Sequence, residues 1–433
     1  MTIADYSVMQ GTASDDTSRA CANCGATLQD LFVDLGMQPP CQAFVPNSEA
    51  DATEAFYPLR AYVCRECFLV QAPSTLSPGE IFTQYAYFSS YSDSWLDHAR
   101  RYTDMAVERF GLNAESFVVE LASNDGYLLR NFVDRGIPCL GVEPALNVAA
   151  VARERGIPTM TEFFGVEVGR KLAQDGRSAD LVIGNNVLAQ CPDIHDFVGG
   201  IAEILKPDGV LTLEFPHLVR LIEDRQFDTI YHEHFFYFSL LSTRNVLAQH
   251  GLRVFDVDTL PTHGGSLRLY ACRDTSTAHQ LSDRVEALAA EEHAFGIGSL
   301  DRYAGFQEQV AALKRSVLRF LIDAKEQGKH VAAYGAPGKG NTLLNFCGIR
   351  TDLIDYAVDR APSKQDHATP GTRIPVFPPE HLRDTRPDYV VIMPWNLKDE
   401  IAEQHRYISD WGGEFVIFLP DVRVLRDGEW SNV

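Results

Sequence analysis

The sequence predicts an α/β protein in which a small cysteine-rich lobe precedes two units of alternating strands and helices. Apolar, strand-like segments alternate with helical segments from residue 116, and the alternation starts again at residue 329. Cysteines gather early in the chain as two C-x-x-C pairs. We therefore expect a flexible tail over residues 1–20, a metal-binding lobe over 21–75, a first α/β domain over 76–278, and a helical connection with a second α/β domain over 279–433.

The composition indicates a folded globular protein and disfavours several other classes. Hydrophobic residues make up 45% and charged residues 22% of the 433 residues, which is typical of a folded globular chain. No apolar run is long enough for a membrane span, and the first twenty residues do not resemble a secretory signal. The net charge of −21 disfavours nucleic acid and anionic membranes as partners. We expect a cytoplasmic protein that is a monomer or a weak homo-oligomer.

The two cysteine pairs predict a structural zinc site. Cys21 and Cys24 form one knuckle, Cys64 and Cys67 form the other, and together they supply four thiolates. Four thiolates complete a tetrahedral zinc shell and leave no open position, so the metal is not catalytic. The alternative is two chance pairs or a redox pair, but no thioredoxin-like strand and helix surround Cys21. Cys41, which lies between the knuckles, is interpreted as a packed or spare thiol.

The first α/β domain can be followed element by element. A helix is expected over residues 95–110, a buried strand over 117–121, a helix over 126–133, a strand over 138–143 and a helix over 145–155. A strand over 180–184, a helix over 194–205, a turn at 206–209 and a strand over 210–214 follow. Residues 279–327 are expected to be helical, with a break at Gly296 and Gly298. The second domain has expected strands at 329–335, 353–358, 388–393 and 414–419.

Polar residues follow the expected strands of the first domain, where open parallel sheets bind ligands. The loop Glu120-Leu-Ala-Ser-Asn-Asp-Gly126 is acidic and poor in glycine, which suits a cofactor without phosphates better than a dinucleotide. Glu143 ends the next strand, where a carboxylate can accept both hydroxyls of a ribose. This arrangement is that of class I S-adenosylmethionine (SAM) methyltransferases, and the alternative is an ordinary domain whose acids cap helices. The expected cofactor-binding residues are Glu120, Ala122, Asn124, Gly126, Glu143, Pro144, Asn185 and Asn186.

The segment Tyr231-His-Glu-His234 places three titratable groups in succession among aromatic residues. Histidine is the natural base near neutral pH, and a carboxylate nearby can orient it. A metal site is a weaker alternative, because the H-E-x-x-H motif needs histidines four residues apart. Histidines with a purely structural role are the third possibility. The segment therefore favours acid–base catalysis.

Three further loops supply candidate substrate contacts. The loop His263-Gly-Gly-Ser-Leu-Arg268 can present backbone N–H groups to an anion, or it can be a plain hairpin turn. The loop Gly335-Ala-Pro-Gly-Lys-Gly340 falls short of a P-loop, but an anion at the following helix N-terminus remains possible. The loop Pro394-Trp-Asn-Leu-Lys398 follows another expected strand and supplies an aromatic surface and a cation. Ordinary strand-to-helix turns are the alternative for the last two loops. The expected substrate-binding residues are His263, Arg268, Tyr334, Lys339, Trp395, Asn396 and Lys398.

Jointly these motifs resemble the zinc-containing, SAM-dependent nucleotide-sugar C-methyltransferases of deoxysugar biosynthesis, over nearly the whole chain from Cys21. The resemblance implies an N-terminal four-cysteine zinc lobe, a central class I SAM methyltransferase (Rossmann-like) domain and a C-terminal Rossmann-like α/β domain. It implies a dTDP-linked 4-keto-6-deoxyhexose as substrate, methylated on a ring carbon, often C3. It also implies His234 as the base, Glu233 beside it, and Tyr231 and Tyr85 against the sugar.

The residues fit this chemistry independently of the resemblance. A carbon next to a ketone can lose a proton to a positioned imidazole, and the resulting enolate needs hydrogen-bond donors at its oxygen, for which tyrosines and His232 are candidates. The cofactors expected are SAM and structural Zn²⁺. Three alternatives stay open: a sugar O-methyltransferase on the same scaffold, a zinc-containing NAD-dependent dehydrogenase, and a non-catalytic zinc scaffold.

Overall fold

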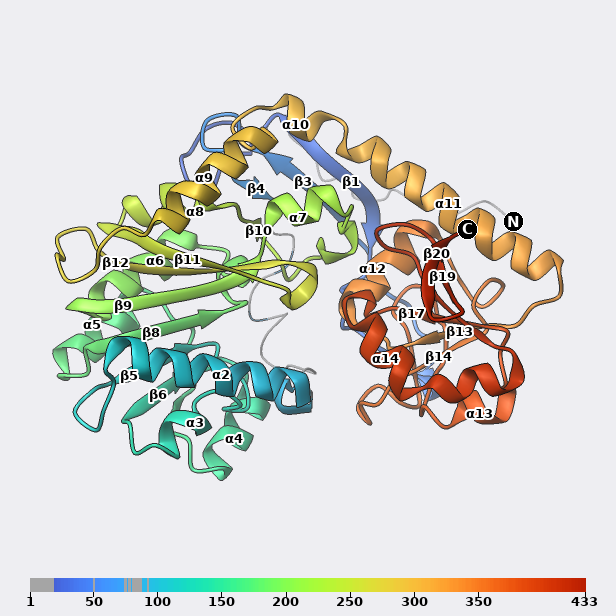
Figure 1. Cartoon of the computed structure of the whole chain (residues 1–433), viewed down its shortest axis with the longest axis horizontal. Coiled ribbons are helices and arrows are strands. Elements are labelled where there is room, and N and C mark those ends of the chain that lie inside the picture. Colours follow the sequence, from blue (N-terminus) through green and yellow to red (C-terminus); the bar gives the residue numbers. More distant parts are fainter. Residues whose placement is uncertain (1–18, 50, 74–75, 77–78, 80–87, 92) are drawn as a thin grey trace, which may run out of the picture.

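Three sheets organise the computed structural model of the chain (Figure 1). A small antiparallel sheet belongs to the N-terminal lobe, and two seven-stranded sheets form the central and the C-terminal α/β units. The structure describes residues 19–49, 51–73, 76, 79, 88–91 and 93–433. The predicted fold class is confirmed: a cysteine lobe followed by two α/β units with parallel strands.

The small sheet carries the metal knuckles at its ends. Its strands, in spatial order, are β1 (Asp30–Gln38), β3 (Tyr57–Val63), β4 (Val70–Gln71) and β10 (Phe236–Tyr237). Cys21 and Cys24 precede β1, and Cys64 and Cys67 lie in the turn between β3 and β4. The last strand comes from the central unit, so the lobe and the central unit share this sheet. The first 3₁₀ turn is η1 (Asn47–Glu49), and β2 (Val45–Pro46) pairs with β15 (His367–Ala368) of the C-terminal unit.

The central sheet has the spatial order β11-β12-β9-β8-β5-β6-β7. Among these described strands, β12 alone runs in the direction opposite to the others. The strands are β5 (Val118–Leu121), β6 (Cys139–Val142), β7 (Thr159–Met160), β8 (Ala179–Asn185), β9 (Leu205–Pro216), β11 (Leu252–Leu260) and β12 (Ser266–Arg273). The helices are α2 (Asp93–Phe110), α3 (Arg130–Val133), α4 (Leu146–Glu154), α5 (Val166–Gln174), α6 (Ile194–Ile204), α7 (Leu218–Glu223) and α8 (Leu240–Ala248), and the 3₁₀ turns are η2 (Ser89–Tyr91), η3 (Leu188–Gln190), η4 (Phe227–Thr229) and η5 (Thr262–Gly264).

The C-terminal sheet has the order β16-β14-β13-β17-β18-β19-β20, of which the first five strands are parallel. Its strands are β13 (Val331–Tyr334), β14 (Tyr356–Val358), β16 (Val376–Phe377), β17 (Tyr389–Ile392), β18 (Glu414–Ile417), β19 (Arg423–Arg426) and β20 (Glu429–Asn432). Its helical elements are α12 (Gly338–Cys347), α13 (His381–Thr385), η6 (Trp395–Leu397), α14 (Lys398–Gln404) and η7 (Arg406–Trp411).

A helical arch joins the two units. Figure 1 shows α9 (Asp283–Phe295), α10 (Asp301–Ala304) and α11 (Phe306–Glu326) in succession along the upper edge of the molecule. The break falls at Gly296, whose φ of +94° provides the left-handed C-cap of α9. Phe306 of α11 stacks on Phe32 of β1 with ring centroids 4.4 Å apart, so the arch and the lobe share one apolar core.

Two local predictions were wrong. The helix expected over 126–133 is only α3, because Gly126 has a φ of +78° and the preceding loop turns instead of starting a helix. The turn expected at 206–209 lies within β9, where the pairing jumps from Ala179 with Leu205 to Leu181 with Val210. The Pro-Asp-Gly sequence there forms an irregularity in a continuous strand. Across the described ranges, no helix has both the length and the apolar character that a bilayer crossing requires.

Candidate functional site

A cavity of about 720 Å³ lies where the lobe, the central unit and the C-terminal unit meet. The ends of β6 and β8, the segment before β10 and the loops after β13 and β17 all contribute to its walls. Four residues with a positive φ line it: Ala122, Asn124, Asn186 and His263. Non-glycine residues rarely adopt this conformation, and such strain concentrates at ligand sites.

Glu143 lines the cavity and is held by two backbone amides. It follows β6, and its two carboxylate oxygens accept the backbone N–H groups of Asn124 and Ala145, each at 2.8 Å. Burial raises the pKa of Glu143, while these two amides favour its charged form. The side chain is 5% exposed and still lines the cavity, so it is held rigid where its remaining lone pairs can accept ribose hydroxyls.

The residues around Glu143 fit SAM. Asn185 lines the cavity, and its buried Oδ1 has no hydrogen-bond partner among the described residues. A buried polar atom without a partner is typical of a ligand contact. Gly126 has a φ of +78°, which disfavours any residue with a Cβ, and a Cβ there would also lie 2.3 Å from Ile157 Cδ1. Glu120, by contrast, is 1% exposed, and burial, followed by the charge of Glu143, raises its pKa well above the usual range.

His234 also lines the cavity and is held in one tautomer. Its Nδ1–H donates to the carbonyl of Thr229 at 3.0 Å, since a carbonyl can only accept. Its Nε2 then accepts from the hydroxyl of Tyr231 at 2.9 Å. Burial lowers the pKa of His234 to about 4, so the ring is neutral near pH 7 and its Nε2 can accept a proton.

Glu233 also lines the cavity, but it contacts a residue that the sequence interpretation left without a role. The thiol of Cys41 donates to Glu233 Oε1 at 3.5 Å. Burial raises the pKa of Glu233 to about 7, and the Cys41 hydrogen bond opposes this. Burial, followed by the charge of Glu233, raises the pKa of Cys41 well above its usual value, so the thiol keeps its proton and remains a donor. Cys41 is thus buried, as expected for a packed thiol, and lies against a candidate catalytic carboxylate.

The C-terminal unit contributes two lysines to the cavity, Lys339 and Lys364, of which Lys364 is paired with Asp359 at 3.4 Å. Lys339 lies at the start of α12, its Nζ lies 4.3 Å from the centre of the Trp395 ring, and it donates to Asn396 Oδ1. In the part of the chain that the structure describes, no carboxylate lies within 4.0 Å of Lys339 Nζ. Burial lowers the pKa of Lys339 to about 8, although the charge of Asp228 acts on it and raises its pKa. The ammonium is therefore available to an anionic ligand at neutral pH.

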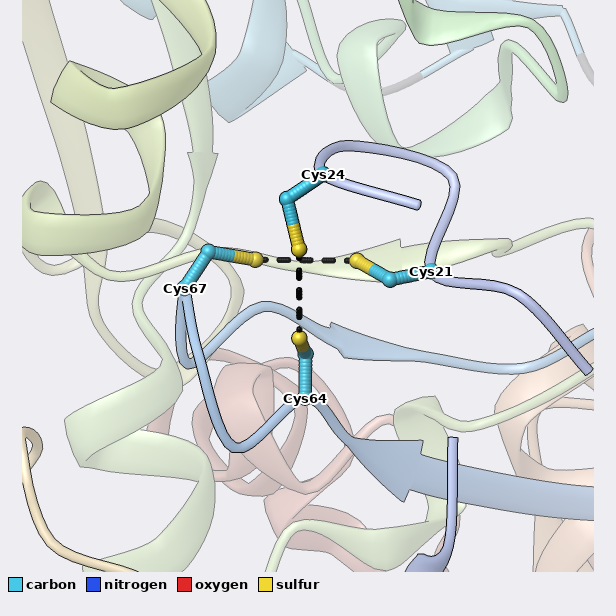
Figure 2. A group of neighbouring side chains, drawn as sticks. All are labelled: Cys21, Cys24, Cys64 and Cys67. Atoms are coloured by element: carbon cyan, nitrogen blue, oxygen red, sulfur yellow. Dashed lines mark hydrogen bonds between the residues drawn. The ribbon is translucent and has the colours of Figure 1, made fainter. Parts of the chain in front are cut away.

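The four predicted metal ligands converge from the two knuckles (Figure 2). All four Sγ atoms lie within 4.8 Å of one another, with Cys21–Cys67 at 3.6 Å and Cys24–Cys64 at 3.5 Å. Thiolates bound to one zinc ion at about 2.3 Å lie roughly 3.8 Å apart, so this donor set fits tetrahedral zinc. The pKa of Cys21 is lowered to about 4, first by the hydrogen bond from Cys67 and further by the amide of Gln71.

The structure brings most of the predicted site residues into the cavity. Those that line it are Ala122, Asn124, Glu143, Pro144, Asn185, Asn186, Tyr231, Glu233, His234, His263, Lys339 and Asn396. Those that lie outside its lining are Glu120, Gly126, His232, Arg268, Tyr334, Trp395 and Lys398. Tyr85 lies outside the described residues. The roles of all these residues stay predictions.

Residues outside the lining have other contacts. The His232 ring lies edge-on to Tyr57 of the lobe, with centroids 6.0 Å apart. Arg268 donates to the buried carboxylate of Glu214 at 2.6 Å, so its charge is matched. Tyr334 shares a hydrogen bond of 2.9 Å with His405 Nε2. Lys398 pairs with the neighbouring Asp399 at 2.6 Å.

Some lining residues were missed by the sequence analysis. Trp95, Tyr127, Phe163 and Phe164 supply aromatic walls, and Gln190 lies beside them. Phe163 and Phe164 follow the two-residue strand β7, which the sequence pattern did not reveal. Had that strand been recognised, the carboxyl-end rule for parallel sheets would have indicated them.

Models of known protein families match three regions of the chain. Residues 21–82 match a family model described as "Putative zinc binding domain", residues 95–257 match a methyltransferase domain, and residues 261–420 match a C-methyltransferase C-terminal domain. The C-methyltransferase NovU of Streptomyces niveus is 37% identical over 408 residues, which cover 94% of this chain and 96% of that protein.

Solved structures match part of the chain. Magnesium protoporphyrin IX methyltransferase from Synechocystis is 16% identical, with a TM-score of 0.33 over 41% of this chain and 83% of that one. An S-adenosylmethionine dependent methyltransferase from Mesorhizobium loti is 15% identical, with a TM-score of 0.33 over 41% of this chain and all of that one. The family assignment does not depend on these two distant matches.

Proposed function

The chain belongs to the SAM-dependent C-methyltransferase family, and from this premise we propose that it methylates C3 of a dTDP-linked 4-keto-6-deoxyhexose in deoxysugar biosynthesis. The enzyme is a C-methyltransferase that uses SAM and a structural zinc ion. This membership sets aside the O-methyltransferase, the NAD-dependent dehydrogenase and the non-catalytic scaffold. The substrate, the carbon and the residue roles are our proposal.

The observation that carries the proposal is the fixed tautomer of His234. A hydrogen bond to the Thr229 carbonyl leaves Nε2 as an acceptor in the cavity that also contains Glu143. A neutral imidazole whose Nε2 carries no proton is suited to remove a proton from a carbon next to a ketone, once the Tyr231 hydroxyl turns from Nε2 to the substrate oxygen. Proton removal from carbon is what C-methylation requires and what methylation of an existing hydroxyl does not.

We assign the remaining roles from position. SAM, when bound, supplies an electrophilic methyl group. Glu143 and Asn185 orient the cofactor, and Tyr231 donates its hydroxyl proton to the oxygen of the enolate that His234 generates. Glu233 stabilises the positive charge on His234 after proton transfer. Lys339 attracts the anionic part of the sugar nucleotide, because its ammonium lines the cavity and no carboxylate lies within 4.0 Å of it among the described residues.

The test is His234→Asn. Turnover should fall by roughly 100-fold to 10,000-fold, because a positioned general base contributes about that much. Solvent deuterium exchange at C3, followed by NMR, should fall in parallel, while the dissociation constant for SAM should stay within about twofold because His234 does not orient the cofactor. Turnover against a panel of dTDP- and GDP-linked 4-keto-6-deoxysugars identifies the substrate and the methylated carbon.

His232→Asn is the matched control. Its ring lies against Tyr57 of the lobe and outside the cavity lining, so we propose that this variant keeps turnover and exchange near the wild-type values. Wild-type exchange in His234→Asn, or an equal loss in both variants, would remove the assignment of the base.

A further inference from the structure

The segment that carries His234 is held by the zinc lobe. β10 begins two residues after His234 and pairs with β4, Phe236 opposite Gln71 and Tyr237 opposite Val70. The N–H of Ala72 donates to the carbonyl of Phe235 at 2.9 Å and continues this ladder. β10 therefore belongs to the sheet of the lobe and not to the seven-stranded central sheet, which meets it only at its end, where Phe238 bridges His217 after β9 in the described structure.

Gln71 contacts the metal knuckle with its side chain while its main chain pairs with β10. Its Nε2 donates to Cys21 Sγ at 3.1 Å, and its Oε1 accepts the N–H of Ala22 at 2.9 Å. The residue is 4% exposed, so these two hydrogen bonds are shielded from water. One buried residue thus connects the first zinc knuckle to the strand that follows His234.

The connection from β10 to His234 is short. The hydroxyl of Tyr237 donates to the carbonyl of His234 at 3.0 Å. The N–H of Phe235 donates to the carbonyl of Ala189 at 2.7 Å, in the η3 turn whose last residue, Gln190, lines the cavity. Cys21, Cys64 and Cys67 belong to the same buried cluster as Phe235 and Phe236. A shift of the knuckle would reach His234 through packed and hydrogen-bonded neighbours.

We propose that Gln71 is a positioning residue that couples the zinc knuckle to the segment carrying His234, so that an intact zinc site holds the base in place. The inference rests on the proposed function in taking His234 as the base. The amide of Gln71 donates to a metal-binding thiolate, which orients the ligand and favours its charged form. The same residue fixes β4 against β10, so loss of the amide relaxes both contacts.

Two variants separate the contacts. Gln71→Leu removes both side-chain hydrogen bonds, whereas Gln71→Glu keeps an acceptor for Ala22 and loses the donor to Cys21. Gln38→Leu is the matched control, since Gln38 is a glutamine of the same sheet, is 2% exposed and donates only to Leu35 O in the described structure. Each protein is measured as zinc-loaded full-length chain for zinc affinity by chelator competition, for SAM affinity, for kcat and for the imidazole NMR resonances of His234.

We expect zinc affinity to fall by about 10-fold to 100-fold in both Gln71 variants, as for other residues that hydrogen-bond metal ligands. The His234 resonances should shift, and kcat should fall by roughly 10-fold. The SAM dissociation constant should stay within about twofold, because the Glu143 carboxylate is held by the N–H groups of Asn124 and Ala145 and not by the lobe. Gln38→Leu should change none of these four quantities, although it lowers thermal stability.

Three results would overturn the coupling. The first is weaker zinc binding with unchanged His234 resonances and kcat, which would confine Gln71 to the metal. The second is an equal loss in Gln38→Leu, which would indicate general destabilisation. The third is wild-type behaviour in both Gln71 variants. Failure of the proposed function is a separate outcome: His234→Asn would stay active, while zinc affinity and the His234 resonances would still report on the coupling.

Discussion

The central and the C-terminal α/β units each place a carboxylate at the end of the strand beside their first strand, and the two carboxylates differ in what they face. Glu143 follows β6 and accepts the N–H groups of Asn124 and Ala145. Asp359 follows β14 and accepts those of Ala336 and Ala361, both at 2.8 Å. The local turn chemistry is therefore the same in both units.

The two carboxylates differ in what lies beside them besides the backbone amides. Glu143 lines the cavity, with no cation paired to it in the described structure, whereas Asp359 does not line it and lies 3.4 Å from Lys364 Nζ. Lys364 also donates to the carbonyl of Ala336 at 2.9 Å, so a side chain of the same unit holds the turn after β13. A shared strand-end carboxylate thus lines the cavity in one unit and is paired with a lysine of its own unit in the other.

Replacement of the two carboxylates tests this comparison most strongly. Glu143→Ala should weaken SAM binding by roughly 100-fold, because hydrogen bonds to a buried charged group contribute about 1.5–3 kcal/mol. Asp359→Asn should leave SAM affinity within about twofold and lower the melting temperature by a few degrees, because it changes only internal contacts. Isothermal titration calorimetry and thermal unfolding measure the two quantities. Equal SAM affinities in the two variants would contradict the division of roles.

The strand-end part of the site could be predicted from the sequence, because parallel strands end at one edge of a sheet and polar residues there lie together. That rule correctly placed Glu143, Asn185 and Asn186 in one cavity. Contacts between distant segments leave no periodic signal in the sequence. Cys41 and Glu233 are 192 residues apart, and their contact follows from packing of the lobe against the central unit.

Arg268 illustrates a different limit of the sequence. Its basic side chain indicated a substrate contact, but β12 pairs with β9 and places Arg268 directly opposite Glu214. An opposite-charge pair across two strands is stable when buried and hydrogen-bonded, so the charge is used within the sheet. Knowledge of the strand order was needed to see this pair.

Lys339 provides the next test, because it is a contribution of the C-terminal unit to the charge of the cavity. Lys339→Gln should raise the KM for the sugar nucleotide by roughly 10-fold while SAM affinity stays unchanged, since one unscreened ion pair contributes about 1.4 kcal/mol. Steady-state kinetics at fixed SAM measure the change. An unchanged KM would show that the C-terminal unit does not provide electrostatic attraction for the substrate.

The pH profile sharpens the same prediction. Lys339 is charged below its pKa of about 8 and loses the charge as the pH rises through that value. His234 must be neutral to act as a base, and it is neutral above its pKa of about 4. We therefore expect kcat/KM to decline modestly as Glu233 becomes protonated near pH 7, to fall steeply near pH 4, and to fall on the alkaline side near pH 8. Lys339→Arg should move the alkaline limb to higher pH, because arginine stays charged throughout this range.

Replacement of Cys41 has the smallest expected effect. It tests whether the C-terminal unit supports the base through the contacts of Cys41 with Asn341 and Glu233. Asn341 of α12 donates its amide to the Cys41 carbonyl at 2.7 Å, and the Cys41 thiol donates to Glu233. Cys41→Ala removes that donor from a carboxylate whose pKa is already about 7, so the pKa of Glu233 should rise further and less of the carboxylate should be charged at pH 7. We expect kcat at pH 7 to fall by roughly twofold to fivefold, the size of one weak hydrogen bond, and to recover as the pH is raised. Cys41→Ser keeps a donor and should restore the profile. If alanine and serine behave alike, the thiol acts only by packing, and the two α/β units contribute to catalysis without this link between them.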